Sequence, residues 1–116
     1  MQLNKTLYYT HNTLFAFYGI LLLLFIFVGL TSAASFDFLS LLLGFGFLGG
    51  LAYLHYKAAI EVEMGTETGK LMSTFIGCIF LLGFPIGTCI GILILLNLRK
   101  SKWQSNVQLK NDEVLE

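Results

Sequence analysis

The sequence predicts an all-α integral membrane protein, with two full transmembrane helices followed by a helical hairpin that glycine and proline break into short arms. Three stretches of the chain contain no charged residue: 12–36, 38–54 and 71–98. Each approaches or exceeds the roughly 17–25 apolar residues that a helix needs to cross about 30 Å of hydrocarbon. Charged residues make up only 12% of the chain, against about 25% in soluble domains. A soluble fold would therefore expose too much apolar surface.

The first two predicted helices cover about 13–30 and 37–60, within a single membrane domain that takes in residues 1–116. The apolar stretch Leu14–Leu30 is longer than the roughly 7–15-residue core of a cleaved signal peptide, so we expect the first helix to be retained. Asp37 can cap the second helix, because its negative charge favours the positive end of the helix dipole. Gly65 and Gly69, in the polar segment that follows, are expected to be helix breakers.

The third apolar region, 71–98, is longer than one untilted span and shorter than two. One interpretation is a single helix kinked at Pro85, which gives a three-span protein. The other is a hairpin with arms over about 68–83 and 86–101, followed by a polar tail over 102–116. In the hairpin, Gly83 would be the left-handed residue that ends the first arm, and Pro85 would start the second.

The placement of the basic residues favours the hairpin, because Lys and Arg in short flanking segments prefer the cytoplasm. With a hairpin, both termini and the segment 57–70 lie on one side together with all seven basic residues. A single third span would instead divide these residues into Lys5, Lys57 and Lys70 against Arg99, Lys100, Lys102 and Lys110. The sequence therefore predicts a multi-pass protein with cytoplasmic N- and C-termini.

Glycines spaced by four residues mark the candidate packing or interface sites. Small residues at i and i+4 let membrane helices approach closely. In an antiparallel hairpin Gly77 would lie opposite Gly91. The glycines at 83, 87 and 91 therefore suit packing inside the hairpin as well as a homo-oligomer seam or a partner-docking groove. The candidate residues are Gly46, Gly50, Gly83, Pro85, Gly87, Thr88 and Gly91.

No catalytic, metal or cofactor site is predicted. The apolar spans contain no Asp, Glu, Lys or Arg, and the sequence has no Ser-His-Asp, HExxH or phosphate-loop pattern. Cys78 and Cys89 share their depth with no His or carboxylate, which disfavours a metal site. His11 and His55 lie near span ends, and we expect them at the membrane interface. A net charge of zero and the lack of a basic, aromatic patch outside the spans disfavour nucleic acid as a partner.

The segment Phe84-Pro-Ile-Gly-Thr88, continued by Gly91 and Ile92, resembles a motif of small bacterial inner-membrane proteins. In those proteins the last helical segment carries Phe-Pro-(Ile/Leu)-Gly-Thr-x-x-Gly-Ile, and a histidine precedes the first span, as His11 does here. The resemblance implies a bacterial cytoplasmic-membrane protein of three or four helices and assigns no activity. The connector Lys57–Lys70 departs from the pattern, since it is rich in Glu where those proteins are rich in Arg and Trp.

The predicted spans have glycine-lined faces, and their apolar stretches contain no charged residues. This combination predicts a non-catalytic small membrane protein that acts by helix–helix packing. It would serve a membrane-protein partner as an accessory subunit, or protect against one as an immunity protein does. The alternative is a self-assembling pore or transport component, in which the glycine seam closes a homo-oligomer.

Overall fold

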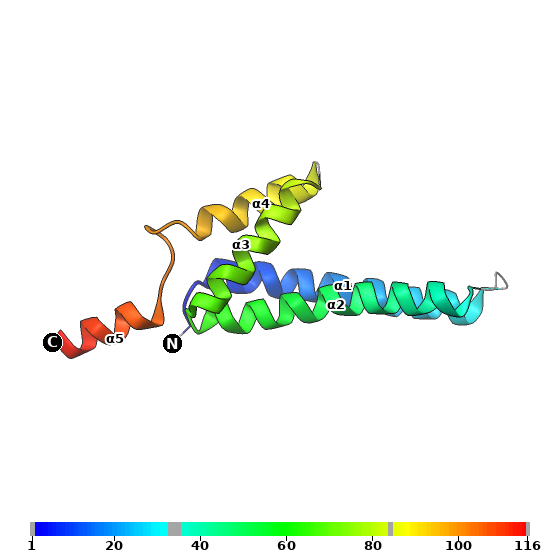
Figure 1. Ribbon diagram of the computed structural model, residues 1–116, viewed down its shortest axis with the longest axis horizontal. Helices are drawn as coiled ribbons and strands as arrows, with labels where there is room; N and C mark the ends of the chain where they lie inside the picture. Colours follow the sequence, from blue (N-terminus) through cyan, green and yellow to red (C-terminus); the bar gives the residue numbers. More distant parts are fainter. Residues whose placement is uncertain (1, 33–35, 84, 116) are drawn as a thin grey trace. The chain divides into compact units, whose positions relative to one another are not determined.

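The computed structural model describes residues 2–32, 36–83 and 85–115, and in these ranges the chain forms five α-helices and no strand (Figure 1). The helices are α1 (Lys5–Thr31), α2 (Phe38–Glu63), α3 (Glu67–Leu81), α4 (Ile86–Asn97) and α5 (Asn106–Leu115). The all-α prediction is confirmed. The chain packs as two units, one of residues 11–57 and one of residues 1–10 with 58–116.

In the unit of residues 11–57, α1 and α2 run side by side in opposite directions (Figure 1). Glycines on α2 make the approach possible. Gly44 leaves room for the ring of Phe25, which a side chain at this position would overlap, and Gly49 faces Leu22. The Phe25 ring also packs edge-on against Phe36 at a centroid distance of 5.9 Å. The packing of this helix pair therefore depends on small residues, as in close pairs of membrane helices.

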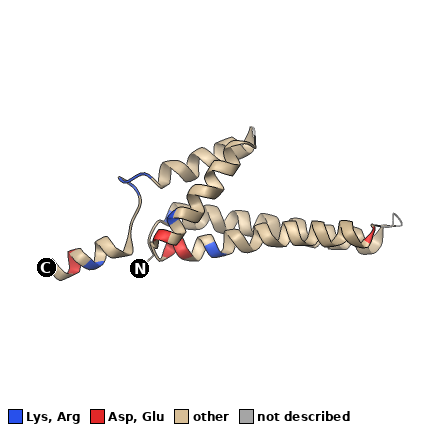
Figure 2. Cartoon of the chain, in the orientation of Figure 1, with Lys and Arg blue, Asp and Glu red and all other residues tan. Residues whose placement is uncertain are grey.

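The outer surfaces of α1 and α2 are apolar. Leu30 is 82% exposed and Phe38 is 80% exposed, and both helices lack charged residues over most of their length (Figure 2). The most apolar windows of the two helices have a mean hydropathy of 2.6 and 1.7, and only 6% and 11% of those windows are buried. Both helices are thus long and apolar enough to cross a membrane, and little of either is buried within the chain.

Asp37 caps α2, as predicted. Its carboxylate accepts a hydrogen bond from the backbone N–H of Ser40 at 2.9 Å, and its backbone carbonyl accepts the N–H of Leu41. The hydrogen bonds from Ser40 hold the pKa of the exposed Asp37 carboxyl below its ordinary value. The Asp37 carboxylate therefore stabilises the first turn of the helix.

Asp37→Ala should loosen the first turn of α2, with faster backbone amide exchange at Ser40 than in the native chain. Asp37→Asn, which keeps an acceptor oxygen, should retain much of the protection. Because the folded-state pKa is depressed, the protection from the carboxylate is complete above the ordinary pKa of 3.8 and is lost as the pH falls through the lower folded value. Hydrogen exchange followed by mass spectrometry, with the intrinsic pH dependence divided out, measures both effects. Equal exchange at Ser40 in the native and Ala variants would contradict this role.

The connection between α2 and α3 contains the one positive-φ glycine of the described residues, Gly65, with φ +68°. Gly65 ends α2 as predicted, because glycine adopts the left-handed conformation without steric cost. Thr66 then caps α3 by accepting the N–H of Gly69 at 3.1 Å. The prediction that Gly69 breaks a helix is wrong. Gly69 lies inside α3, where a Cβ would come within 2.6 Å of the Glu61 backbone, so it permits close packing instead.

Helices α3 and α4 fold back on each other as two arms (Figure 1), and no single kinked helix covers 71–98. The left-handed conformation predicted for Gly83 is wrong. Leu82 stays right-handed (φ −78°, ψ −15°), and the N–H groups of Leu82 and Gly83 bond to carbonyls three residues back, so the last turn tightens without a left-handed residue. Pro85 directly precedes α4, where its missing N–H is harmless. Phe84, in the predicted turn, lies outside the described residues.

Several helix ends differ from the predicted ones. Helix α1 begins at Lys5 rather than near residue 13. Helix α4 ends at Asn97, four residues short of the predicted end, because the carbonyl of Arg99 accepts the N–H groups of Lys102 and Trp103 in a tight turn. The predicted polar tail contains a separate helix, α5, which makes five helices instead of four.

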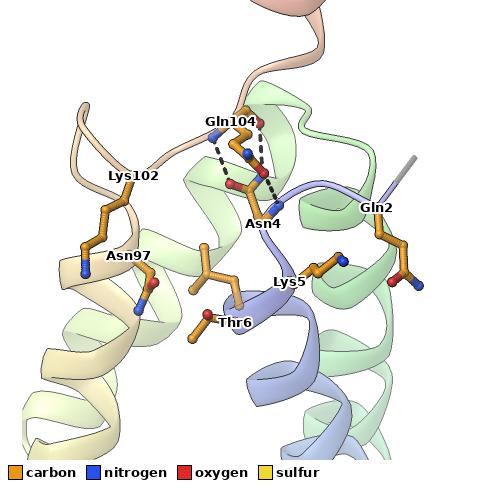
Figure 3. A pocket seen from close by; sticks show the side chains of 8 residues that line it. Gln2, Asn4, Lys5, Thr6, Asn97, Lys102 and Gln104 are labelled. Carbon is orange, nitrogen blue, oxygen red and sulfur yellow. Dashed lines mark hydrogen bonds between the residues drawn. The ribbon is translucent and has the colours of Figure 1, made fainter.

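Three segments far apart in the sequence meet at a set of hydrogen bonds that we call the terminal clasp. It joins residues 3–4, 62–65 and 104–106 (Figure 3). The backbone N–H of Leu3 donates to the carbonyl of Glu63, and that of Asn106 donates to the carbonyl of Gly65, each at 3.1 Å. The beginning of α1, the end of α2 and the segment before α5 are therefore tied together.

Asn4 is the centre of the clasp (Figure 3). Its amide nitrogen donates to the carbonyls of Val62 and Gln104, both at 2.9 Å, and its amide oxygen accepts the N–H of Gln104 at 2.8 Å. Its backbone N–H donates to the side chain of Gln104. Asn4 has φ +49°, a conformation that asparagine tolerates better than most residues. A polar pocket of about 440 Å³ opens beside it, with Thr6 of α1 on one side and Lys102 on the other.

Candidate functional site

The predicted interface glycines fall into two groups, and the first group lies inside the α3–α4 hairpin. A Cβ at Gly91 would come within 2.7 Å of the Gly77 carbonyl oxygen, and one at Gly87 within 2.9 Å of the Phe80 oxygen. Gly83 faces Gly87, where a Cβ would come within 3.4 Å of its Cα. The predicted pairing of Gly77 with Gly91 is confirmed. These glycines therefore serve the internal contact between two antiparallel arms.

Thr88 and Pro85 belong to the same contact. The Thr88 hydroxyl donates to the carbonyl oxygen of Leu81 at 3.0 Å, and Leu81 is the last residue of α3. The last carbonyls of a helix have no partner within the helix, so this bond satisfies one of them from the opposite arm. Pro85, whose carbonyl accepts the N–H of Cys89, starts that arm. The motif residues of the hairpin are thus used in closing it.

Gly46 and Gly50 form the second group and lie on α2 in the other unit. A Cβ at either position would meet nothing within 4 Å. This contrasts with Gly44 and Gly49 of the same helix, which face Phe25 and Leu22 of α1. We call the surface around these two residues the Gly46–Gly50 face. It is an open strip of small residues on a helix that is long enough to span a membrane.

Two histidines that the sequence places at span ends form a buried pair between α1 and α2. The Nδ1 atoms of His11 and His55 lie 3.1 Å apart, and the two side chains are 0% and 1% exposed. The ring centroids are 5.3 Å apart with 36° between the ring planes. This centroid distance is close to the Nδ1–Nδ1 distance plus the two ring radii, so the rings point at each other almost head-on.

An aromatic ring stacks on one member of the histidine pair. Tyr18 of α1 stacks on the His55 imidazole, with centroids 5.5 Å apart and 11° between the planes. On the adjoining residues, Phe15 packs against Tyr56 at 5.5 Å. The stack fixes the plane of the His55 ring, because offset parallel rings of this kind attract each other. Both histidines are buried and link two helices, so neither has the exposure that a position at the membrane interface would permit.

The hydrogen bond between the two Nδ1 atoms requires one imidazole to donate and the other to accept. Two protonated rings would both be donors and would repel, so at least one ring keeps a lone pair directed at its partner. A polar contact of this kind between apolar helices is worth about 1 kcal/mol. Ionisable groups at such positions are also candidates for function.

The sequence contains a signal for this pair that reading each helix by itself misses. His11 lies 20 residues before the end of α1, and His55 lies 17 residues after the start of α2. Two helices joined by a short connection place residues at similar distances from that connection at similar heights. Whether the two rings face each other depends on how each helix is rotated, which the spacing alone does not give.

Among the residues that the structure describes, no group of three or more His, Cys, Asp or Glu side chains could hold a metal ion. The comparison with known proteins gives no further guide, because no protein family, no curated protein and no solved structure matches the chain.

Proposed function

We propose that this chain is a non-catalytic integral membrane protein that packs against a membrane-inserted partner protein through the Gly46–Gly50 face. The observation that carries the proposal is that these two glycines, spaced by four residues, are exposed and that a Cβ added at either would meet nothing within 4 Å. Paired small residues on a membrane helix let a second helix approach closely. The hairpin glycines already pack within the chain, whereas Gly46 and Gly50 form an open pair with the spacing that suits a partner helix.

The apolar surfaces of α1 and α2 support a location in the bilayer. Large exposed apolar side chains on both helices, with the polar histidines turned inward, are the reverse of the distribution in soluble proteins. Lipid is the surrounding that such helices require. The resemblance of the Phe84–Ile92 motif to bacterial proteins supports the bacterial cytoplasmic membrane.

The terminal clasp supports a topology with both termini on the cytoplasmic side. Asn4 and Gln104 are directly hydrogen-bonded. A single third span would separate them by the hydrocarbon thickness of about 30 Å, whereas a hairpin returns the chain to the side of its N-terminus. All seven basic residues then lie on that side, as cytoplasmic segments require.

Two roles fit a protein that works by packing alone: an accessory subunit that stabilises its partner, and a protector that occludes a membrane-acting one. The alternative from another class is a self-assembling pore or transport component, in which the partner is a second copy of the chain. The spans lack the buried carboxylates and lysines that ion-coupled carriers use, which favours the accessory or protector role.

Gly46→Ile combined with Gly50→Ile should abolish partner binding without unfolding the chain. The new side chains enter open space on the chain itself but prevent close approach of another helix. The matched control is Gly19→Ile on α1, the same substitution at a glycine of the other helix where an added Cβ also meets nothing within 4 Å. Extraction in a mild detergent, affinity purification and native mass spectrometry measure the complex.

We expect the glycine variant to lose at least about tenfold of the co-purified partner, equivalent to about 1.4 kcal/mol, and the control to keep it. Equal recovery in both variants would contradict the Gly46–Gly50 face as the docking surface. A homo-oligomer that dissociates only in the glycine variant, with conductance in liposomes, would establish the pore alternative in place of the accessory role.

A further inference from the structure

We infer that His11 and His55 form a binding site for a single monovalent copper ion, Cu⁺, held in linear coordination between their Nδ1 atoms. This inference does not depend on any partner protein. Two nitrogen ligands, one from each helix, meet in a site with almost no solvent exposure: the Nδ1 atoms of the two histidines lie 3.1 Å apart. Imidazole nitrogen is a good ligand for copper.

The head-on orientation of the rings selects linear coordination. Each Nδ1 lone pair lies in the plane of its ring and points away from the ring centre, so rings that face each other direct both lone pairs to the space between them. A tetrahedral ion such as Zn²⁺ requires lone pairs that converge at an angle, and four ligands in all. No third His, Cys, Asp or Glu completes such a set among the described residues.

The separation of the two Nδ1 atoms must increase slightly when an ion binds between them. With metal–nitrogen bonds of about 2 Å, a linear ion sets the two nitrogens about 4 Å apart, so each ring must withdraw by about half an ångström from its place in the hydrogen-bonded pair. The stacking of Tyr18 on His55 keeps the plane of that ring fixed while this happens. Each imidazole then carries its proton on Nε2 and presents the Nδ1 lone pair to the ion, so binding needs no net release of a proton.

The lack of negatively charged ligands at the site favours a monovalent ion. Both ligands are neutral when they bind, and the cost of moving an ion out of water rises with the square of its charge. A divalent ion would therefore need carboxylate or thiolate ligands to offset its desolvation, and this site offers none from the described residues. A singly charged, weakly hydrated ion with two nitrogen ligands suits a dry site between apolar helices.

The test uses the purified chain in detergent with Cys78→Ser and Cys89→Ser, because both cysteines are exposed and thiolates compete for Cu⁺. Cu⁺ is supplied with a reductant in the absence of oxygen and competed against a chromogenic Cu⁺ chelator. We expect one ion per chain, with two nitrogen neighbours and no sulfur in X-ray absorption. Zn²⁺ should bind at least about 100-fold more weakly.

Replacing either ligand separates this site from adventitious binding. His11→Asn and His55→Asn should each lower the Cu⁺ affinity by at least about 100-fold. Tyr53→Phe, at an exposed position of α2 outside the histidine pair, should leave it unchanged. Circular dichroism establishes whether each variant remains helical. If an Asn variant unfolds, the cysteine-free parent protein alone provides the test. The inference is overturned if that protein takes up no Cu⁺, if it binds Cu⁺ through more than two ligands, or if it prefers Zn²⁺.

Discussion

Gly91→Ala is expected to force apart the two arms of the α3–α4 hairpin and to lower the free energy of unfolding by about 2–3 kcal/mol. The added Cβ would lie 2.7 Å from the carbonyl oxygen of Gly77 and 2.9 Å from the backbone nitrogen of Leu81. Both neighbours are backbone atoms of α3, so no side-chain rotation can relieve the overlap. Only a shift of the whole arm can, and such a shift also weakens the bond from Thr88 to Leu81.

Gly50→Ala is the matched control for this change. It makes the same substitution in a helix where nothing lies within 4 Å of the new Cβ, and alanine favours a helix over glycine by up to about 1 kcal/mol. Denaturant titration in mixed micelles, followed by circular dichroism, should therefore show opposite signs for the two variants. A Gly91→Ala protein as stable as the native chain would mean that the arms are not in close contact.

Asn4→Ala is expected to release the terminal clasp and to destabilise the unit of residues 1–10 and 58–116 by about 2–4 kcal/mol. The substitution removes an amide that donates to Val62 and Gln104 and accepts from Gln104, all with distances of 2.9 Å or less. The backbone groups of these partners would be left without a protein partner in a largely buried place, which costs more than the bonds themselves contribute. Alanine also tolerates the positive φ at this position less well than asparagine.

Asn97→Ala provides the comparison, because the Asn97 amide donates to Leu93 of its own helix and not across the fold. We expect a change within about 0.5 kcal/mol for that variant. Amide exchange gives a second readout: Gln104 should lose protection in Asn4→Ala and keep it in Asn97→Ala. Asn4→Gly, which accepts the positive φ but lacks the amide, separates backbone strain from lost hydrogen bonds. If the Gly variant is as stable as native, the side-chain bonds contribute nothing.

The residue pattern was sufficient to predict the helices and the broken third region. Apolar stretches without charge have one stable form in a low-dielectric surrounding, because every backbone polar group must be bonded within its own segment. The end of α2 at Gly65, the Asp37 cap and the start of α4 after Pro85 follow from equally local rules of backbone geometry and dipoles. The predicted helix break at Gly69 and the predicted left-handed conformation at Gly83 are wrong because glycine is permissive: its position in the sequence does not say whether it turns the chain or lets another segment approach.

What the sequence by itself determined is the set of long apolar helices and their apolar surfaces, and the spacing about a hairpin turn predicted the pairing of Gly77 with Gly91. Only the tertiary structure decided that Gly46 and Gly50 stay open, that Asn4 meets Gln104 across the length of the chain, and that His11 faces His55. The physical reason is that a helix presents each residue on a definite side, and the side that meets a neighbour depends on rotation and register between separate segments. A nearly uniform apolar surface carries no periodic signal for that rotation, so the contacts of small and polar residues set it.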